Sequence, residues 1–145
     1  MTRADIAGLI PHAGPMCLLD GVVHWDGDRI RCVSGSHRDV DNPLRSGGQL
    51  PALCGIEYAS QAIAVHGGLA RQRGEKPRAG YLASVRDVAC HRERMDELDG
   101  SLFVEASRVL GDEDRVIYEF RLWVGAVEIL SGRAAVVLDA GGAGG

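Results

Sequence analysis

The feature that most constrains the fold is a long segment in the middle of the chain that carries almost no charge. Between Arg45 and Arg71 the only formally charged side chain is Glu57. From Pro51 to about Arg73, apolar residues alternate with alanine and glycine around the whole circumference of a helix, which predicts a helix buried on most of its surface. Pro51 suits its first turn, where the missing N–H matters least. The small residues would let strands approach the helix backbone closely.

The segments on either side of this helix have the patterns of β-strands. Residues 18–25 and 29–36 flank Asp26-Gly27-Asp28, a sequence typical of a hairpin turn. Four more strands are expected after the helix, at residues 80–90, 102–110, 115–124 and 127–138. This order shows no β-α-β alternation, which argues against a parallel doubly wound sheet. We therefore predict an α+β fold with one long helix against a six-stranded, mostly antiparallel sheet.

Length and composition limit the class of protein. The 145 residues are 46% hydrophobic and 25% charged, as expected for one ordinary globular domain over residues 1–138. The Gly/Ala tail at 139–145 is expected to be disordered. A net charge of -4 does not favour nucleic acid or an anionic membrane as partner. No apolar run approaches the roughly 20 residues of a membrane span, and the first residues lack a signal-peptide pattern, so we expect a cytoplasmic protein.

The cysteines and the known sequence signatures give no sign of a metal or cofactor. Cys17, Cys32, Cys54 and Cys90 form no Cys-x-x-Cys pair and do not cluster with histidines at ligand spacing. In a reducing compartment they are expected to be small buried apolar residues. The chain also lacks the nucleophile elbow, the P-loop, the dinucleotide fingerprint and the His-Glu-x-x-His motif.

Glu57 is the residue that does not fit its surroundings. A carboxylate in a buried helix is costly unless it has a dedicated partner. A carboxyl group in such a place suits a general acid or base. It could equally face a local polar patch and accept structural hydrogen bonds. The residues alone leave both interpretations open.

Five histidines could act together with Glu57. His37 opens a long irregular loop at residues 37–50, and long loops inside compact domains often carry function. The alternative is a solvent-exposed side chain that contributes little packing. His66 follows Glu57 by nine residues, which at about 100° per residue places it on the opposite helix face as a buried, hydrogen-bonded residue. His12, in a turn-like segment, is expected to be structural or to line the rim of the site, and His24 and His91 are expected to be exposed at strand ends.

The start of the central helix is a second candidate for binding. The backbone amides of Ala52 and Leu53 open this helix. A helix N-terminus offers N–H groups without intrahelical partners and the positive end of the helix dipole. Such a group of amides could polarise a carbonyl oxygen.

Several motifs together resemble one family. Residues 9–16 (LIPHAGPM) and 18–22 (LLDGV) resemble the opening of the bacterial 3-hydroxyacyl-[acyl-carrier-protein] dehydratases. Pro51-x5-Glu57-x3-Gln61-Ala62 resembles their central helix, and residues 81–88 (YLASVRDV) resemble the strand after it. The sequences of residues 37–44 and 55–59 are similar to those of a dehydratase-like branch of the family found with aryl polyene biosynthesis clusters. The resemblance covers most of residues 9–138.

The resemblance implies a hot-dog fold, in which the sheet wraps the long helix, and a dimer with its sites at the subunit interface. The partner subunit would be a second copy or a homologous hot-dog subunit. Within the site, a loop histidine of one subunit would face the glutamate of the other. The substrate partner would be an acyl carrier protein bearing a phosphopantetheine-linked acyl chain.

The same resemblance assigns roles to individual residues. His37 and Glu57 would be catalytic. The acyl thioester would contact four other positions, namely Ala52, Leu53, Gln61 and Ser84. No cofactor or metal is implied.

The chain departs from the family pattern at the loop histidine. In the fatty-acid dehydratases this histidine lies eight residues before the proline that matches Pro51, and that position here is Pro43. His37 lies six residues earlier, so either the loop brings it to the same place or the base has been lost. Ala52 also stands where the family has glycine after the helix proline.

The sequence therefore predicts elimination of water from a 3-hydroxyacyl thioester to give the trans-2-enoyl thioester. His37 would remove the α-proton, protonated Glu57 would donate to the departing hydroxyl, and the Ala52 and Leu53 amides would stabilise the enolate. Two alternatives remain. A hot-dog thioesterase would use Glu57 to activate water without His37, and a non-catalytic acyl-binding subunit would support a catalytic partner.

Overall fold

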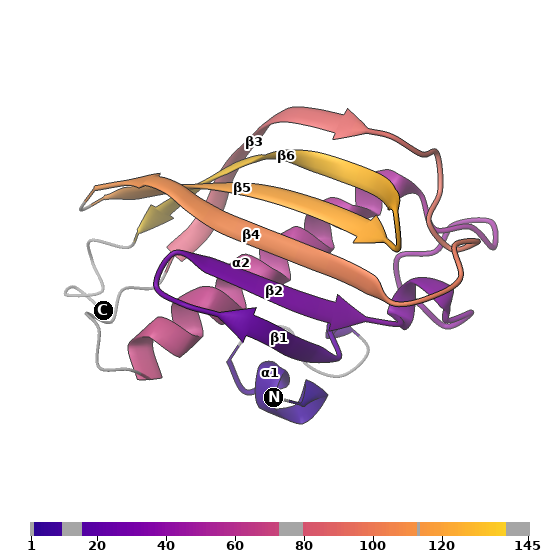
Figure 1. Cartoon of the computed structure of the whole chain (residues 1–145), viewed down its shortest axis with the longest axis horizontal. Coiled ribbons are helices and arrows are strands. Elements are labelled where there is room, and N and C mark those ends of the chain that lie inside the picture. The colour runs from indigo at the N-terminus through magenta and orange to yellow at the C-terminus, as the bar shows by residue number, and fades with distance from the viewer. Residues whose placement is uncertain (1, 10–15, 73–79, 113, 139–145) are drawn as a thin grey trace.

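The computed structural model describes residues 2–9, 16–72, 80–112 and 114–138, and it confirms the expected hot-dog arrangement. One long helix, α2 (Gly55–Gln72), lies against the concave face of a six-stranded sheet (Figure 1). A short helix, α1 (Arg3–Ala7), was not predicted from the sequence. It begins at a capping box in which the Thr2 and Asp5 side chains bind each other's backbone N–H groups.

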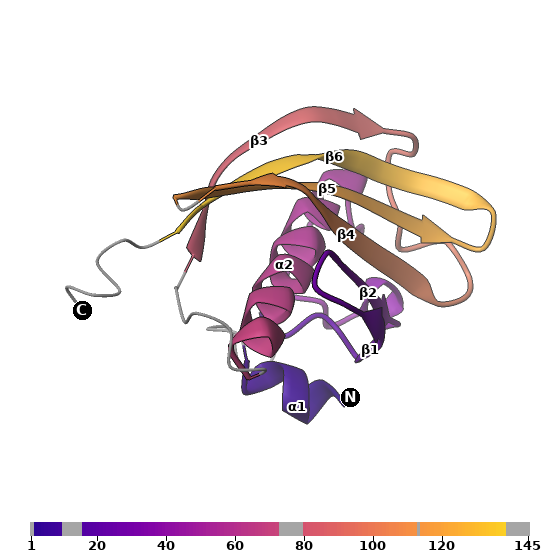
Figure 2. The same ribbon diagram turned by 60° about the vertical axis from the view of Figure 1, so that its left-hand side comes forward.

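The sheet is antiparallel throughout, with the strand order β1-β2-β4-β5-β6-β3. Figure 2 shows it curving over α2, with β3 along one edge and β1 along the other. The strands are β1 (Gly21–Trp25), β2 (Arg29–Ser34), β3 (Gly80–Cys90), β4 (Leu102–Gly111), β5 (Arg115–Val124) and β6 (Val127–Leu138).

The first two strands and the helix begin or end slightly differently from the expectation. β2 ends at Ser34 because the chain turns into a 3-10 helix at Ser36–Arg38. A second 3-10 turn, Ala52–Cys54, precedes α2. The predicted hairpin between β1 and β2 is confirmed, and the Asp26 side chain accepts the backbone N–H groups of Asp28 and Arg29.

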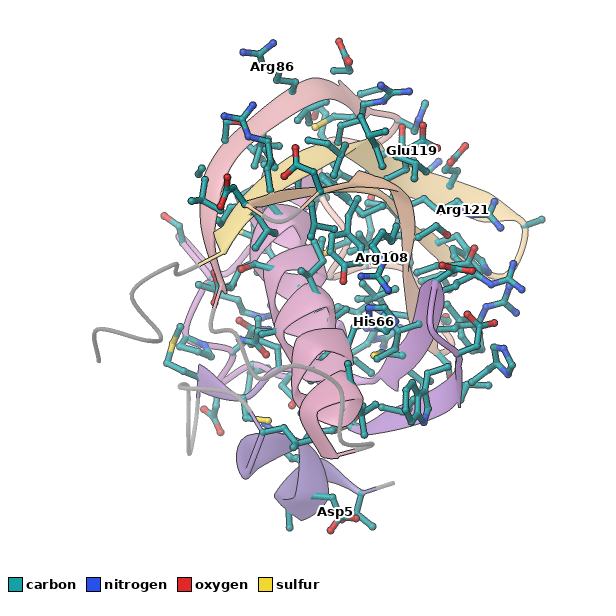
Figure 3. The ribbon with its side chains drawn as sticks, turned by 90° about the vertical axis from the view of Figure 1, so that its left-hand side faces the viewer. Asp5, His66, Arg86, Arg108, Glu119 and Arg121 are labelled. Carbon is teal, nitrogen blue, oxygen red and sulfur yellow. The ribbon has the colours of Figure 1, made fainter. Side chains whose placement is uncertain are left out.

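Strand β5 shows how the sheet separates a core face from an outer face. Alternate residues of β5 are buried towards α2, and Glu119 and Arg121 point outward (Figure 3). Buried positions of neighbouring strands complete this core under the helix. On the outer face, Arg133 pairs with Glu119 at 2.8 Å, and Arg121 lies over the Trp123 ring. The outer face is therefore a charged surface and the helix side is the hydrophobic core.

The small residues of α2 do allow close approach, most clearly at Gly55. A β-carbon at Gly55 would lie 2.8 Å from Leu130 Cδ2 and 2.9 Å from Leu122 Cδ2. Real β-carbons essentially never come this close to another heavy atom. The first residue of α2 therefore packs its backbone directly on β5 and β6.

We expect Gly55→Ala to lower the free energy of unfolding by about 1–3 kcal/mol, because the added methyl group overpacks the core. Gly27→Ala is the matched control, since a β-carbon at Gly27 meets nothing within 4 Å. The control should change the free energy of unfolding by less than about 0.5 kcal/mol. Urea unfolding of both variants measures the difference, and equal stabilities would contradict the close packing at Gly55.

The cysteines are less uniform than expected. Cys17 and Cys32 are buried, as predicted, and burial raises the pKa of Cys32 to about 12. Cys54 is half-buried and Cys90 is exposed, so the prediction of burial is wrong for Cys90. The predicted disordered tail at 139–145 and the predicted structural role of His12 lie outside the described residues. In the described part of the chain, no helix has the length and hydropathy needed to cross a membrane.

Candidate functional site

Glu57 lies in the first turn of α2 and is half-buried. Its Oε1 accepts a hydrogen bond from Gln61 Nε2 at 3.3 Å, one helical turn along. The i, i+4 spacing places these two side chains on the same face of the helix. The carboxyl group therefore has a defined orientation beside a buried amide.

Gln61 fastens the N-terminal segment to this face of α2. Its side chain is only 1% exposed. Its Oε1 accepts the Leu18 N–H at 2.9 Å, and its Nε2 donates to the Met16 carbonyl at 2.6 Å. All of these bonds lie within the chain, so the structure gives Gln61 the role of holding Glu57 and residues 16–18 in place. Contact between Gln61 and the substrate stays a prediction.

His37 is completely buried, with an exposed fraction of 0%, so the alternative of a solvent-exposed loop side chain is wrong. Its Nε2 lies 2.9 Å from the Leu98 carbonyl oxygen. Because a carbonyl can only accept, Nε2 carries the proton and Nδ1 carries the lone pair of the neutral ring. Burial lowers the pKa of His37, which favours that neutral form.

The Nδ1 atom of His37 has an unusual environment. Among the described residues, it is the one buried side-chain nitrogen or oxygen without a hydrogen-bond partner. An unsatisfied buried acceptor is costly and calls for an explanation, of which a catalytic role is one. His37 and Glu57 have separate partners in this chain, Leu98 and Gln61 respectively.

A buried hydrogen-bonded group that includes Ser36, the residue before His37, was not predicted from the sequence. Tyr58 OH lies 2.7 Å from Ser36 Oγ and accepts from Asn42 Nδ2 at 3.0 Å. Asn42 Nδ2 also donates to the Ser36 carbonyl at 2.8 Å. Ser36 Oγ donates to the Leu18 carbonyl at 2.8 Å, beside Ser34 Oγ. The segment Ser34-Gly35-Ser36 directly before His37 was the available signal.

The rest of the loop at residues 37–50 is held by arginine and aspartate side chains. Arg45 Nε donates to the Asp39 carbonyl at 2.7 Å. Asp96 Oδ1 accepts the Leu50 N–H at 2.9 Å, and the Asp96 carboxylate also binds the Arg94 guanidinium. The Arg94 hydrogen bond holds the pKa of Asp96 well below its usual range. The long loop is therefore an ordered part of the fold.

The helix start differs from the expectation at Ala52. The Ala52 N–H donates to the Glu93 carbonyl at 3.0 Å, so the prediction of a free amide there is wrong. Leu53 is 56% exposed and borders a shallow depression beside the helix start. The depression is lined by Pro51, Ala52, Leu53, Cys90, His91, Arg92 and Glu93. Leu53 therefore becomes the better candidate for a donor to a substrate carbonyl.

Ser84 lies in the edge strand β3, where it pairs with Ala135 of β6. It is half-buried. A contact between Ser84 and an acyl chain stays a prediction.

The other described histidines match the expectation. His66 is buried on α2 (Figure 3), where its Nδ1 and Nε2 lie 2.7 Å from Tyr118 OH and the Asp26 carbonyl oxygen. His24 and His91 are exposed. Within the described ranges, no three metal-ligating side chains gather at one point. A second depression, on the outer sheet face beside Glu105 and Arg121, contains none of the predicted site residues.

A family model described as ApeP dehydratase, of the ApeP-like family, matches residues 4–140. The chain belongs to the ApeP-like dehydratase family. Its activity class is therefore that of a dehydratase, a type of lyase, as the resemblance implied. No curated protein sequence matches the chain.

Solved structures agree with this family assignment. The ApeI:P dehydratase heterocomplex of Xenorhabdus doucetiae matches this ApeP-like chain with a TM-score of 0.79 and 25% identity, over 95% of this chain and 91% of that one. A thioesterase of Haemophilus influenzae matches with a TM-score of 0.70 and 11% identity, over 95% and 90%. AziG of S. sahachiroi matches with a TM-score of 0.63 and 16% identity, over 90% and 97%. The last two show the fold alone.

Proposed function

We propose that this ApeP-like dehydratase removes water from a 3-hydroxyacyl thioester carried on an acyl carrier protein. The product is the trans-2-enoyl thioester. The half-buried Glu57 carboxyl, oriented by Gln61 and the only formally charged side chain between Arg45 and Arg71, is the observation that carries the proposal.

The reaction needs one base and one acid. His37 Nδ1 takes the α-proton, and the electrons of the breaking C–H bond form the new double bond. Glu57 gives its proton to the 3-hydroxyl group, which leaves as water. An amide at the helix start, with Leu53 as the candidate, stabilises the enolate charge on the thioester oxygen. Each acid–base role contributes roughly 10² to 10⁴ in rate.

The enclosure of His37 sets a condition on this mechanism. The ring is fully buried in this conformation, so the atoms that cover Nδ1 have to move aside before a substrate reaches it. The same observation favours a second candidate function. In that case the chain supplies Glu57 to a composite site, and a homologous hot-dog subunit supplies the base.

Mass spectrometry of a 3-hydroxyacyl carrier protein after incubation with this chain tests the proposal. Loss of the mass of one water supports dehydration, and release of the free acid indicates a thioesterase. No change with this chain alone, followed by loss of water when a homologous hot-dog subunit is added, supports the second function. No change in both incubations contradicts both proposals.

We also propose that the β3 edge pairs with a second hot-dog subunit. An unpaired edge strand is a liability that pairing across a two-fold axis removes. On β3, Leu82 is 39% exposed and Val88 is 36% exposed, which gives the edge apolar side chains for a partner to cover. The ApeI:P match is itself a heterocomplex, which supports a homologous subunit as partner in addition to a second copy.

We expect a dimer by light scattering at micromolar concentration, either alone or with the homologous subunit. The double variant Leu82→Lys/Val88→Lys should raise the dimer dissociation constant at least about tenfold, because it places charge in the interface. Leu110→Lys, at an exposed apolar position near the end of β4, is the control and should leave assembly unchanged. A monomeric parent chain under both conditions would count against the composite site.

A further inference from the structure

The turn that carries His37 is attached to α2 through one tyrosine. Tyr58 is fully buried and directly follows Glu57 in the first turns of α2. Its hydroxyl binds Ser36 Oγ at 2.7 Å and Asn42 Nδ2 at 3.0 Å. The residue after Ser36 is His37. The same tyrosine is therefore adjacent to the proposed acid in sequence and hydrogen-bonded to the turn of the proposed base.

The attachments of this turn come from three other parts of the chain. Ser36 Oγ also donates to the Leu18 carbonyl, the Arg45 guanidinium donates to the His37 carbonyl at 3.4 Å, and Leu98 binds the His37 ring. Of all these partners, only Tyr58 comes from the helix that bears Glu57. A shift of the turn relative to α2 therefore has to break or bend the bond between Tyr58 and Ser36.

We propose that Tyr58 is a positioning residue whose hydroxyl, through Ser36 and Asn42, fixes the His37 turn relative to Glu57. This inference rests on the proposed function in assigning His37 and Glu57 as base and acid. Tyr58 itself transfers no proton. Burial raises the pKa of its hydroxyl, so it stays a neutral hydrogen-bonding group at physiological pH.

The test compares Tyr58→Phe with Tyr118→Phe. Tyr118 is the matched control because it is also a buried tyrosine, and its hydroxyl binds His66 instead of a residue of the His37 turn. We expect Tyr58→Phe to reduce kcat by about tenfold, the equivalent of one hydrogen bond, with KM changed less than about twofold. Tyr118→Phe should keep kcat within about twofold, although its thermal midpoint falls.

A second readout does not require activity. Nitrogen-15 NMR of the histidine rings, with His37→Gln used for assignment, reports the tautomer and titration of His37. In Tyr58→Phe the turn loosens and water reaches the ring, so its pKa should rise towards the ordinary value. The charged groups that act on the ring (Arg38, Asp39 and Arg45) are unchanged in this variant. Tyr118→Phe should leave the His37 signals as in the parent.

The outcomes distinguish a failure of the proposed function from a failure of the role proposed for Tyr58. An inactive parent contradicts the proposed function, and the NMR comparison then still decides the role of Tyr58. Unchanged kcat together with unchanged His37 signals in Tyr58→Phe overturns the inference. If Tyr58→Phe does not fold, Ser36→Ala removes the other end of the bond together with the donor to the Leu18 carbonyl, and it should lower kcat at least about tenfold. Where both single variants fold, the loss in the double variant should be smaller than the sum of the two single losses, because the two side chains share one hydrogen bond.

Discussion

Glu57→Gln is expected to reduce turnover at least about a hundredfold, the low end of what a general acid contributes. The glutamine amide has almost the shape of the carboxyl group and can still accept the hydrogen bond from Gln61 through its oxygen. It cannot deliver a proton to the leaving hydroxyl. Steady-state dehydration of a 3-hydroxyacyl carrier protein measures the loss, and circular dichroism checks that the fold is retained.

Two companion variants separate the role of Glu57 in the reaction from a role in structure. Glu119→Gln removes an exposed carboxylate from the outer sheet face, where it pairs with Arg133, and should leave turnover unchanged. Glu57→Asp keeps the acid but withdraws it by one methylene group, so it should fall between the parent and Glu57→Gln. If Glu57→Gln is as active as the parent, Glu57 is structural and the proposed mechanism is wrong.

His37→Gln should lower turnover by roughly 10² to 10⁴. Its amide can donate to the Leu98 carbonyl in place of Nε2, but it offers no basic nitrogen to take the α-proton.

His37→Ala tests the contribution of the His37 side chain to stability. It leaves the Leu98 carbonyl without this donor and leaves a void in the interior. We therefore expect it to lower the free energy of unfolding by about 1–3 kcal/mol. The sequence had suggested little loss of stability, because a side chain in an irregular loop was expected to contribute little packing. Full activity of His37→Gln would assign the base to another residue or subunit.

The pH dependence of stability gives an independent check on His37. Burial lowers the pKa of His37 in the folded state, whereas a histidine in the unfolded chain has a pKa of about 6.5. Above that pH both states are neutral at this position. As pH falls through about 6.5, the unfolded state takes up a proton that the folded state does not, so the free energy of unfolding decreases. His37→Gln should show a weaker decrease between about pH 6.5 and the folded-state pKa in chemical denaturation.

The architecture was predictable because hydrophobic periodicity and turn residues indicate each helix, strand and turn within a short segment of the sequence. In β5, apolar residues alternate because one face of the strand meets the core, and the segment around Glu57 carries almost no charge because most of α2 is buried. Helix α1 was missed because five residues give too short a period, although Thr2 and Asp5 carry its capping box. The end of β2 was misplaced because Ser36 bonds to partners distant in sequence, Leu18 and Tyr58.

The candidate site was less predictable than the fold. Glu57 was found because an isolated charge in an apolar segment is visible in the sequence. The burial of His37 was not, because it depends on the Leu98 carbonyl, which lies 61 residues away along the chain. The Ala52 N–H likewise binds the Glu93 carbonyl, and no local sequence pattern indicates a hydrogen bond between residues so far apart in the chain. Residue type thus indicated the chemistry, and long-range backbone contacts decided which atoms are accessible.

The short segment at residues 16–18 sets a boundary for anyone who shortens this chain or joins it to another protein. The six strands alone suggest that the domain could begin at Gly21. However, Gln61 holds the backbone of Met16 and Leu18, and the Leu18 carbonyl accepts the hydroxyl of Ser36. One tripeptide therefore supports both the helix face of Glu57 and the turn of His37. A protein trimmed at residue 20 would keep every strand but lose the segment that holds both of its proposed catalytic groups in place.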